Sequence, residues 1–150
     1  MKTGTIPDLV IRQAHPDDLP GITQLLESLH LPTSGVTDHI PHFFVAESKG
    51  TTIGTMGLEL YGDTALLRSA GVSPEYQGMG LGDKMYGILL TYAQEFGIKE
   101  LMLLTTTAEE YFRRRGFTTI ERTAVNGAVT ASREFQDACP TTATVMSKTL

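Results

Sequence analysis

The residues with the clearest chemical potential lie in one glycine-rich segment, Gly71-Val72-Ser73-Pro74-Glu75-Tyr76-Gln77-Gly78-Met79-Gly80-Leu81-Gly82. A strand-like run leads into it and a long helical pattern follows it. Glycines without Cβ atoms let the backbone approach a ligand closely. The start of the helix would add free N–H groups and the positive end of the helix dipole. Together these features suit a pyrophosphate, and the alternative is a glycine turn that binds nothing.

The spacing of these glycines separates the segment from two common phosphate-binding motifs. Gly78, Gly80 and Gly82 alternate. The dinucleotide fingerprint requires G-x-G-x-x-G, and the phosphate loop requires Gly-Lys-Ser/Thr after its glycines. Neither pattern is present.

The segment does resemble the first signature of the GNAT superfamily of N-acetyltransferases. Gln77 to Gly82 fits the pattern (Arg/Gln)-x-x-Gly-x-(Gly/Ala), and Val72 and Pro74 precede it at the usual offsets. Downstream, Ala108 to Phe117 is similar to the second signature of the family, which closes with Gly-Phe. The two signatures together, on the expected elements, are strongly specific.

The resemblance implies a co-substrate, acetyl-coenzyme A, and a role for each residue of the first signature. Backbone N–H groups would hold the pyrophosphate, and they come from Gln77, Gly78, Met79, Gly80, Leu81 and Gly82. The strand edge at Gly71 and Val72 would pair with the pantetheine arm where the family splays two strands apart. The Val72 N–H would polarise the thioester carbonyl as a one-donor oxyanion hole.

Three further segments resemble one branch of the superfamily, the arsenic-resistance N-acetyltransferases, which are similar to short N-acetylglutamate synthases. These segments are Tyr61 to Ser69, Leu103 to Glu109, and Glu134-Phe135 followed by Cys139-Pro140. The resemblance implies a link to arsenic resistance but does not identify the acceptor amine.

Two positions depart from the family pattern. Many relatives carry a tyrosine that protonates the leaving thiolate where this chain has Phe112, which we expect to contact the coenzyme instead. Tyr111 lies about 100° around the helix from that position, so we expect packing or a coenzyme contact rather than acid catalysis. Thr105 replaces a frequent asparagine, and its single hydroxyl could still bind the coenzyme.

Several side chains near the expected thioester site are candidates for acceptor chemistry. Glu59 is the candidate general base, and a salt-bridged glutamate is the alternative. Arg68 lies within an apolar strand, where it either pairs with a carboxylate or binds an anionic acceptor bidentately. Thr106 and Thr107 would add hydroxyl contacts to the acceptor. Arg113 to Arg115 would contact the coenzyme 3′-phosphate or form a solvated helix end.

Hydrophobic periodicity predicts the elements that position these residues. Strands are expected at 9–13, 43–47, 52–61, 64–72, 101–104, 118–121 and 144–147. Helices are expected after Pro16, at 33–40, at 80–96 and at 108–115, with a short one after Gly127. This order predicts an α/β fold of the GNAT type, with a mixed central sheet of six to seven strands and helices on both faces.

Length and composition limit the remaining possibilities. The 150 residues suit a single domain, 1–150. The formal net charge of −5 disfavours nucleic acid or an anionic membrane as partner. Cys139 is the one cysteine, so no internal disulfide can form. With no signal-peptide pattern, no long apolar run and no zinc spacing, we expect a cytoplasmic protein without a metal site.

The sequence thus predicts an enzyme that acetylates the amine of a small amino acid or analogue by direct attack on the thioester, with a homodimer as one oligomeric option. One alternative is an acetyltransferase that acts on a protein N-terminus or a lysine. The other is a non-catalytic acyl-coenzyme A binding module, which the loss of the tyrosine at Phe112 supports.

Overall fold

A seven-stranded mixed sheet forms the centre of the computed structural model, which describes residues 5–125, 127–132, 134–138 and 143–150. The sheet order is β1-β2-β3-β4-β5-β7-β6. Its strands are β1 (Leu9–Gln13), β2 (Phe43–Ser48), β3 (Thr51–Tyr61), β4 (Thr64–Val72), β5 (Glu100–Thr105), β6 (Thr118–Ile120) and β7 (Thr144–Thr149). All neighbouring strands are antiparallel except β4 and β5, so the predicted mixed sheet is confirmed.

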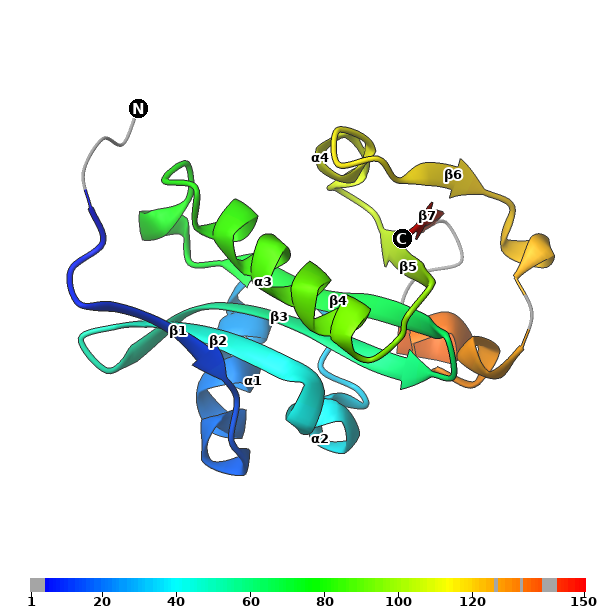
Figure 1. The fold of residues 1–150 in the computed structure, drawn as a ribbon. Coiled ribbons are helices and arrows are strands. Elements are labelled where there is room, and N and C mark those ends of the chain that lie inside the picture. The colour runs from blue at the N-terminus through cyan, green and yellow to red at the C-terminus, as the bar shows by residue number, and fades with distance from the viewer. Residues whose placement is uncertain (1–4, 126, 133, 139–142) are drawn as a thin grey trace.

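Helices cover both faces of this sheet, as predicted (Figure 1). Helices α1 (Leu19–Ser28) and α2 (Val36–His39) lie on one face, and α3 (Leu81–Glu95) lies on the other. The short helix α4 (Glu109–Arg113) follows β5. Each face has its own apolar core: Ile22 and Leu26 of α1 pack with Phe43, whereas Met85 and Leu89 of α3 join the larger cluster.

The predicted element bounds hold to within one or two residues for most elements, with three differences. Helix α2 begins only at Val36, because Gly35 before it has a φ of +82° and ends the extended loop. Ile88 and Phe96 are apolar positions of the helix predicted at 80–96, yet they are 38 % and 52 % exposed. The helix predicted after Gly127 is a 3₁₀ turn at Ala128–Ala131.

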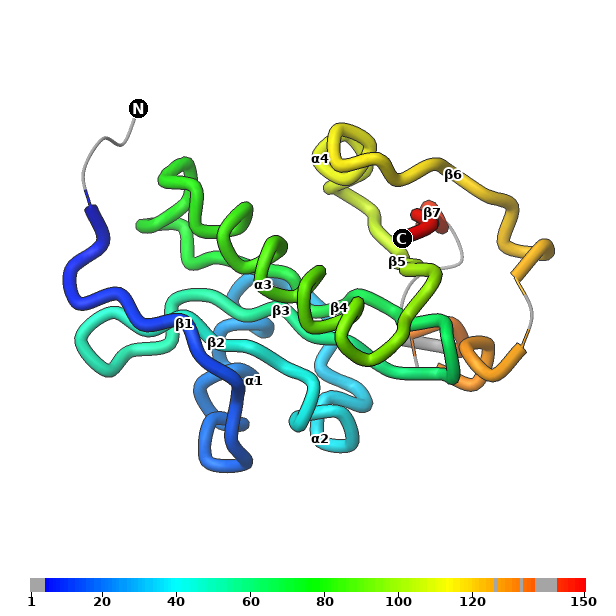
Figure 2. Tube along the Cα trace, viewed as in Figure 1, coloured from blue at the N-terminus to red at the C-terminus, as the bar shows by residue number. Residues whose placement is uncertain are grey.

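A short π-helical turn, Glu134–Ala138, follows that 3₁₀ turn, and both lie near the end of the β3–β4 hairpin (Figure 2). Cys139, the one cysteine, lies outside the described residues. Within the described part of the chain, no helix is long and apolar enough to span a bilayer, and no three His, Asp, Glu or Cys side chains form a metal cluster.

The sheet opens between its two parallel strands. β4 pairs with β5 only from Thr64 to Leu66, opposite Glu100 to Met102. Beyond these pairs the two strands diverge, and both strands line the same cavity there. A bulge in β4 adds to this opening, since Ser69 has a φ of +57° where the β3–β4 register shifts.

Candidate active site

The first of two cavities at the opening lies between the end of β4 and the start of α3. It has a volume of about 670 Å³, which suits a cofactor-sized ligand. Gly71 and Val72 of β4 form one wall, and the loop from Tyr76 to Gly80 forms the floor. Residues of α4 and the turn after it, up to Arg115, close the far side.

The glycine loop adopts backbone conformations that favour glycine. Gly78 and Gly80 have φ values of +79° and +81°, a region that side-chain-bearing residues avoid. A Cβ atom at either glycine would meet nothing within 4 Å, so the backbone there faces open space. The Lys84 N–H donates to the Gly80 carbonyl at 3.1 Å, and the three N–H groups between them have no preceding helical carbonyl.

The β4 edge at Val72 also faces the opening. The Ser73 N–H donates to the Ile53 carbonyl of β3 at 2.7 Å, and successive N–H groups along a strand point to opposite sides. The Val72 N–H therefore points away from β3, toward the gap beside β5. The Val72 carbonyl accepts a hydrogen bond from Gln77 Nε2 at 2.8 Å, which ties the glycine loop to the strand.

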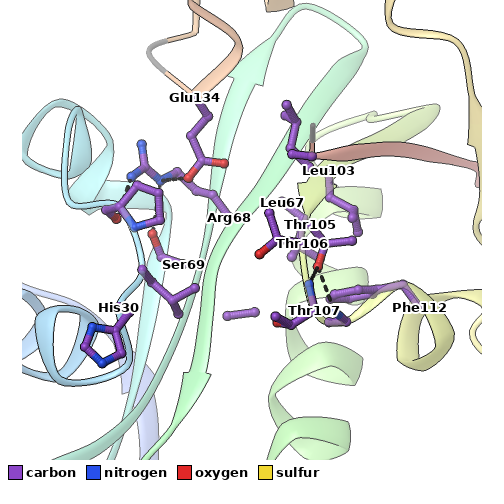
Figure 3. Close-up of a pocket in the computed structure, with 16 residues that line it drawn as sticks. His30, Leu67, Arg68, Ser69, Leu103, Thr105, Thr106, Thr107, Phe112 and Glu134 are labelled. Carbon is purple, nitrogen blue, oxygen red and sulfur yellow. Dashed lines mark hydrogen bonds and ion pairs between the residues drawn. The ribbon is translucent and has the colours of Figure 1, made fainter. Parts of the chain in front are cut away.

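The second cavity, of about 450 Å³, lies between β4 and β5 on the side of the α1–α2 loop (Figure 3). Arg68 and Ser69 line one side, and Thr106 and Thr107 line the other. The two cavities share five lining residues and therefore adjoin: Leu31, Ala70, Thr107, Ala108 and Phe112. A ligand in the first cavity can thus meet a different ligand in the second.

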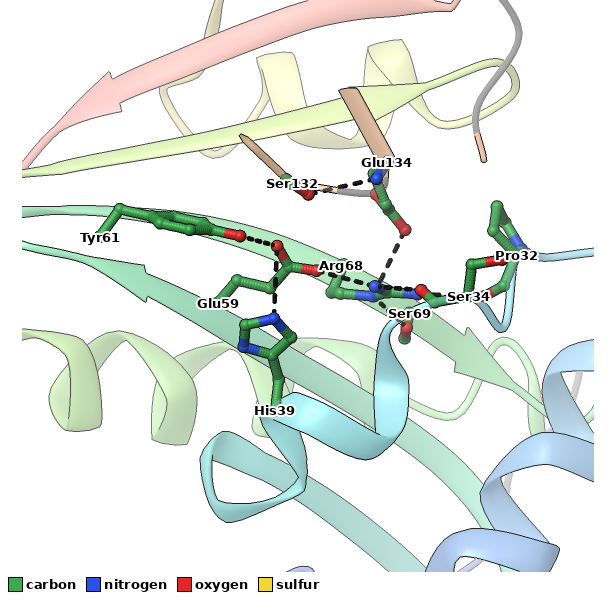
Figure 4. A network of polar contacts seen from close by, with 9 residues as sticks. All are labelled: Pro32, Ser34, His39, Glu59, Tyr61, Arg68, Ser69, Ser132 and Glu134. Carbon is green, nitrogen blue, oxygen red and sulfur yellow. Dashed lines mark hydrogen bonds and ion pairs between the residues drawn. The ribbon is translucent and has the colours of Figure 1, made fainter. Parts of the chain in front are cut away.

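Arg68 is buried and tied into a polar network in the wall of the second cavity (Figure 4). Its Nη1 atom lies 2.8 Å from Glu59 Oε2, and its Nε atom lies 3.4 Å from Glu134 Oε2. Its remaining hydrogen bonds go to Ser69 Oγ at 3.0 Å, the Ser34 carbonyl at 2.7 Å and the Pro32 carbonyl at 3.4 Å. The carboxylate pairing that the sequence left open is therefore present, and Arg68 also lines the cavity.

Glu59 belongs to this network but lines neither cavity. It is fully buried, and its Oε1 atom accepts a hydrogen bond from the Tyr61 hydroxyl at 2.5 Å. Burial alone would raise the pKa of Glu59, but hydrogen bonds from Tyr61, Arg68 and Ser132 lower it overall. A buried carboxylate with a lowered pKa is a weak proton acceptor, so this geometry favours the salt-bridged alternative.

Tyr111 and Phe112 both lie at the cavities, in different surroundings. Phe112 is buried and lines both cavities. Tyr111 lines the first cavity, where its hydroxyl donates to Asp83 Oδ1 at 2.9 Å. Arg115 stacks 3.6 Å above the Tyr111 ring and pairs with Asp83. Burial and the Asp83 hydrogen bond raise the pKa of Tyr111 to about 12.

Of the remaining candidate residues, one lines a cavity and the others lie away from both. Thr105 Oγ1 accepts the Ala108 N–H at 2.8 Å and so fixes the turn that leads into α4, while the residue lines the second cavity. The Met79 side chain lines a separate hollow near Ile6. Arg113 pairs with Glu109 and Glu110 away from the cavities.

Sequence reasoning missed three groups that line the cavities. Thr55 and the Leu29–Leu31 turn carried no motif, because an isolated threonine in an apolar strand and an apolar helix end are common. Glu134 belonged to a quoted segment, but its position in the chain gave no sign that it would reach Arg68.

Comparison with known proteins finds a family model and curated relatives that match most of the chain. The model of the Acetyltransferase (GNAT) family matches residues 11–135. An amino-acid acetyltransferase of Neisseria meningitidis is 31 % identical over 118 residues, which cover 73 % of this chain and 27 % of the relative. An amino-acid acetyltransferase of Mycobacterium tuberculosis is 32 % identical over 130 residues, covering 80 % of this chain and 74 % of the relative.

A solved structure shows the same fold over nearly the whole chain. N-acetylglutamate synthase from Neisseria gonorrhoeae, complexed with coenzyme A and N-acetyl-glutamate, superposes with a TM-score of 0.80 and 25 % identity. The match covers 99 % of this chain but only 36 % of the synthase. The chain thus spans about a third or less of the Neisseria proteins.

Proposed function

The chain belongs to the GNAT family of acetyltransferases, and we propose that it transfers the acetyl group of acetyl-coenzyme A to the amine of a small amino acid or analogue. The single observation that carries this proposal is the opening between β4 and β5, where two cavities adjoin. One cavity is built around a glycine loop and the other around a buried arginine. The relatives named amino-acid acetyltransferase support the choice of acceptor.

The residues of the first cavity fit the coenzyme. A pyrophosphate would lie against Gly78 and Gly80, where any Cβ atom would take up the space it needs, and against the N–H groups at the start of α3. The cavity lining includes Gln77, Leu81 and Gly82. Arg114 and Arg115 line the far side and offer positive charge to the 3′-phosphate.

The pantetheine arm would enter along the β4 edge. Gly71 and Val72 line the cavity there, and the Val72 N–H points into the gap. Phe112 and Thr105 would bound the arm from the β5 side, Phe112 by direct contact and Thr105 by fixing the turn before α4. The Val72 N–H would then polarise the thioester carbonyl.

The acceptor would occupy the second cavity with its carboxylate toward Arg68. The weakest contact of the guanidinium is that of Nη2, 3.4 Å from the Pro32 carbonyl. We therefore propose that Nη2 donates a hydrogen bond to the carboxylate of the amino-acid substrate. Thr106 and Thr107 lie across the cavity and would bind the polar groups of the same molecule (Figure 3).

The chemistry is a direct transfer. The neutral amine attacks the thioester carbonyl carbon, a C–N bond forms, the C–S bond breaks, and the coenzyme leaves as a thiolate. The amine nitrogen loses one proton and the thiolate gains one. Water at the cavity mouth would carry both protons, because the carboxylates that line the cavities, Glu134 and Asp83, are each paired with an arginine. We propose Glu59 as the residue that positions Arg68 rather than as the base.

Three narrower proposals concern the biological role, the site of action and the oligomeric state. The resemblance to the arsenic-resistance N-acetyltransferases supports a role in arsenic resistance. We also propose a cytoplasmic site of action. A homodimer would be tested by sedimentation.

A thiol-release assay over a panel of amines tests the proposed function. Free amino acids should release coenzyme A from acetyl-coenzyme A faster than spermidine, lysine-containing peptides or peptide N-termini do. A peptide that outperforms every amino acid would favour the protein-acetylating alternative. No release with any amine, together with tight coenzyme binding, would favour the non-catalytic module.

A further inference from the structure

Thr55 carries a buried hydroxyl that the fold leaves without a hydrogen bond. The residue lies in the middle of β3, and its side chain is fully buried. Its Oγ1 atom has no hydrogen-bond partner anywhere in the described residues. An unpaired buried polar group lowers the stability of a protein, so such groups in native proteins call for an explanation.

The position of this hydroxyl points to a ligand. Thr55 pairs across the sheet with Gly71 of β4, so both residues address the same face. This is the face that α1 covers, because a Cβ at Gly71 would lie 2.6 Å from Cδ1 of Leu29, at the end of α1. On the opposite face, a Cβ at Gly54 would meet Met85 and Leu81 of α3. Thr55 thus faces the acceptor side of the sheet, next to the strand edge at Gly71.

Thr55 also lines the first cavity, the proposed coenzyme site, and not the second. Two apolar neighbours from the α1 side of the sheet line the cavity with it, Leu29 and Leu31. Neither of these side chains can accept or donate a hydrogen bond of ordinary strength. The hydroxyl is therefore the single side-chain polar group of this apolar wall.

We propose that Thr55 Oγ1 donates a hydrogen bond to a carbonyl oxygen of the acyl-pantetheine arm and so binds acetyl-coenzyme A. This assignment rests on the proposed function, because it takes the arm to run along Gly71 and Val72. The oxygen is covered in the unliganded protein, so the Leu29 side chain moves off Gly71 as the arm enters. The hydroxyl then exchanges an unpaired state for a paired one, which adds to the affinity for the coenzyme.

The arm offers two kinds of carbonyl, the thioester and the amides of pantetheine. Both present the same acceptor oxygen to a hydroxyl. Comparing acetyl-coenzyme A with coenzyme A separates them, since only the former has the thioester. A loss of affinity confined to acetyl-coenzyme A assigns the thioester, and an equal loss for both assigns an amide.

The test replaces the hydroxyl by a methyl group with Thr55→Val, which keeps the size and the β-branch. In the unliganded protein the change removes an unpaired polar group, so the melting temperature should rise by about 2–4 °C. In calorimetry the same change should weaken acetyl-coenzyme A binding by roughly three- to tenfold, the range of one hydrogen bond. Thr55→Ser keeps the hydroxyl, so its affinity for acetyl-coenzyme A should match that of the wild type. Thr51→Val, on the exposed start of β3, is the matched control and should change neither quantity.

Opposite signs for stability and affinity are the signature of a hydroxyl retained for binding. A Thr55→Val protein that melts higher and binds the coenzyme as tightly as wild type would overturn the inference while leaving the proposed function intact. A variant that melts lower would also overturn it, because the hydroxyl would then be paired without a ligand. If the wild-type protein does not bind acetyl-coenzyme A, both the inference and the proposed function fail.

Discussion

Arg68 Nη1 lies 2.8 Å from Glu59 Oε2 in the interior of the sheet, where the two side chains are 0 % and 1 % exposed. The pair joins β3 to β4 just beyond the point where β4 diverges from β5. Because Arg68 also bonds the Ser34 and Pro32 carbonyls, the α1–α2 loop is fixed to the same point. One buried ion pair therefore connects the stability of the sheet to the shape of the second cavity.

The stability of the protein should depend on the charge of Glu59. Its pKa is lowered in the folded state, so its contribution is complete above the ordinary value of 4.5 and is lost as the pH falls below that value. Glu59→Gln should cost about 3 kcal/mol at pH 7, since one partner of a buried pair loses its charge. Urea unfolding at pH 7 and pH 4 should show a smaller pH dependence for the variant. Glu110→Gln, in an exposed pair, is the control and should resemble wild type at both values.

The same variant distinguishes a positioning role for Glu59 from general base catalysis. If Glu59 positions Arg68, Glu59→Gln should raise the KM for the acceptor and leave the pH profile of kcat in place. A base would instead contribute 10²–10⁴-fold to the rate. Loss of the acidic limb of the kcat profile, with KM unchanged, would restore Glu59 as the base.

Coenzyme binding should depend on Gly80. Gly80→Asp would place a carboxylate where the pyrophosphate is proposed to lie, so acetyl-coenzyme A binding should become undetectable in calorimetry. Gly50 is a matched control, because its φ of +80° equals that of Gly80 within a degree and its Cβ position is equally open. Gly50→Asp, in the β2–β3 turn, carries the same backbone strain far from the cavity. Equal binding by both variants would remove the main support for the coenzyme site.

Tyr111 should be dispensable for the chemical step. Its hydroxyl donates to Asp83, beside the glycine loop rather than beside the second cavity. Tyr111→Phe should therefore keep kcat within about threefold, since a positioned acid contributes far more. Steady-state rates from pH 6 to 10 provide the measurement. A hundredfold loss with a changed alkaline limb would identify Tyr111 as the acid.

The sequence predicted most of the fold because its signals were local. Gly80 before an apolar stripe marked the start of α3, and Lys49-Gly50 marked a hairpin turn whose residues both have positive φ values. Periodicity could not separate the buried Leu89 from the exposed Phe96, since the two are seven residues apart on one stripe and only tertiary packing decides which one is covered.

The candidate site was predictable where motifs defined it and not where distant segments meet. The glycine loop was predicted from its spacing together with its resemblance to the first signature of the family. The partners of Arg68 come from the α1–α2 loop, β3 and the segment at Glu134, and no local pattern places these three together. Glu59 was taken as a candidate base because a strand position does not reveal whether a carboxylate meets a cavity or an arginine.

Arg68 should determine the preference for acceptors that carry a carboxylate. The guanidinium lines the second cavity and has its weakest contact at Nη2, so an α-carboxylate can bind there and direct the amine toward the thioester. Free amino acids should therefore have a higher kcat/KM than their amides with the wild-type enzyme.

Arg68→Ala would leave Glu59 and Glu134 buried without their cation and is expected to fold poorly. Arg68→Lys keeps the positive charge but loses the planar guanidinium, which donates hydrogen bonds to several oxygen atoms at once. It should lower kcat/KM for the free acid by roughly 10- to 100-fold, reduce the preference for acids over amides, and leave the Kd for acetyl-coenzyme A unchanged. Circular dichroism melting of the same variant checks that the loss is not one of folding. If the wild-type enzyme acetylates acids and amides equally well, Arg68 only supports the cavity wall, and another group must recognise the acceptor.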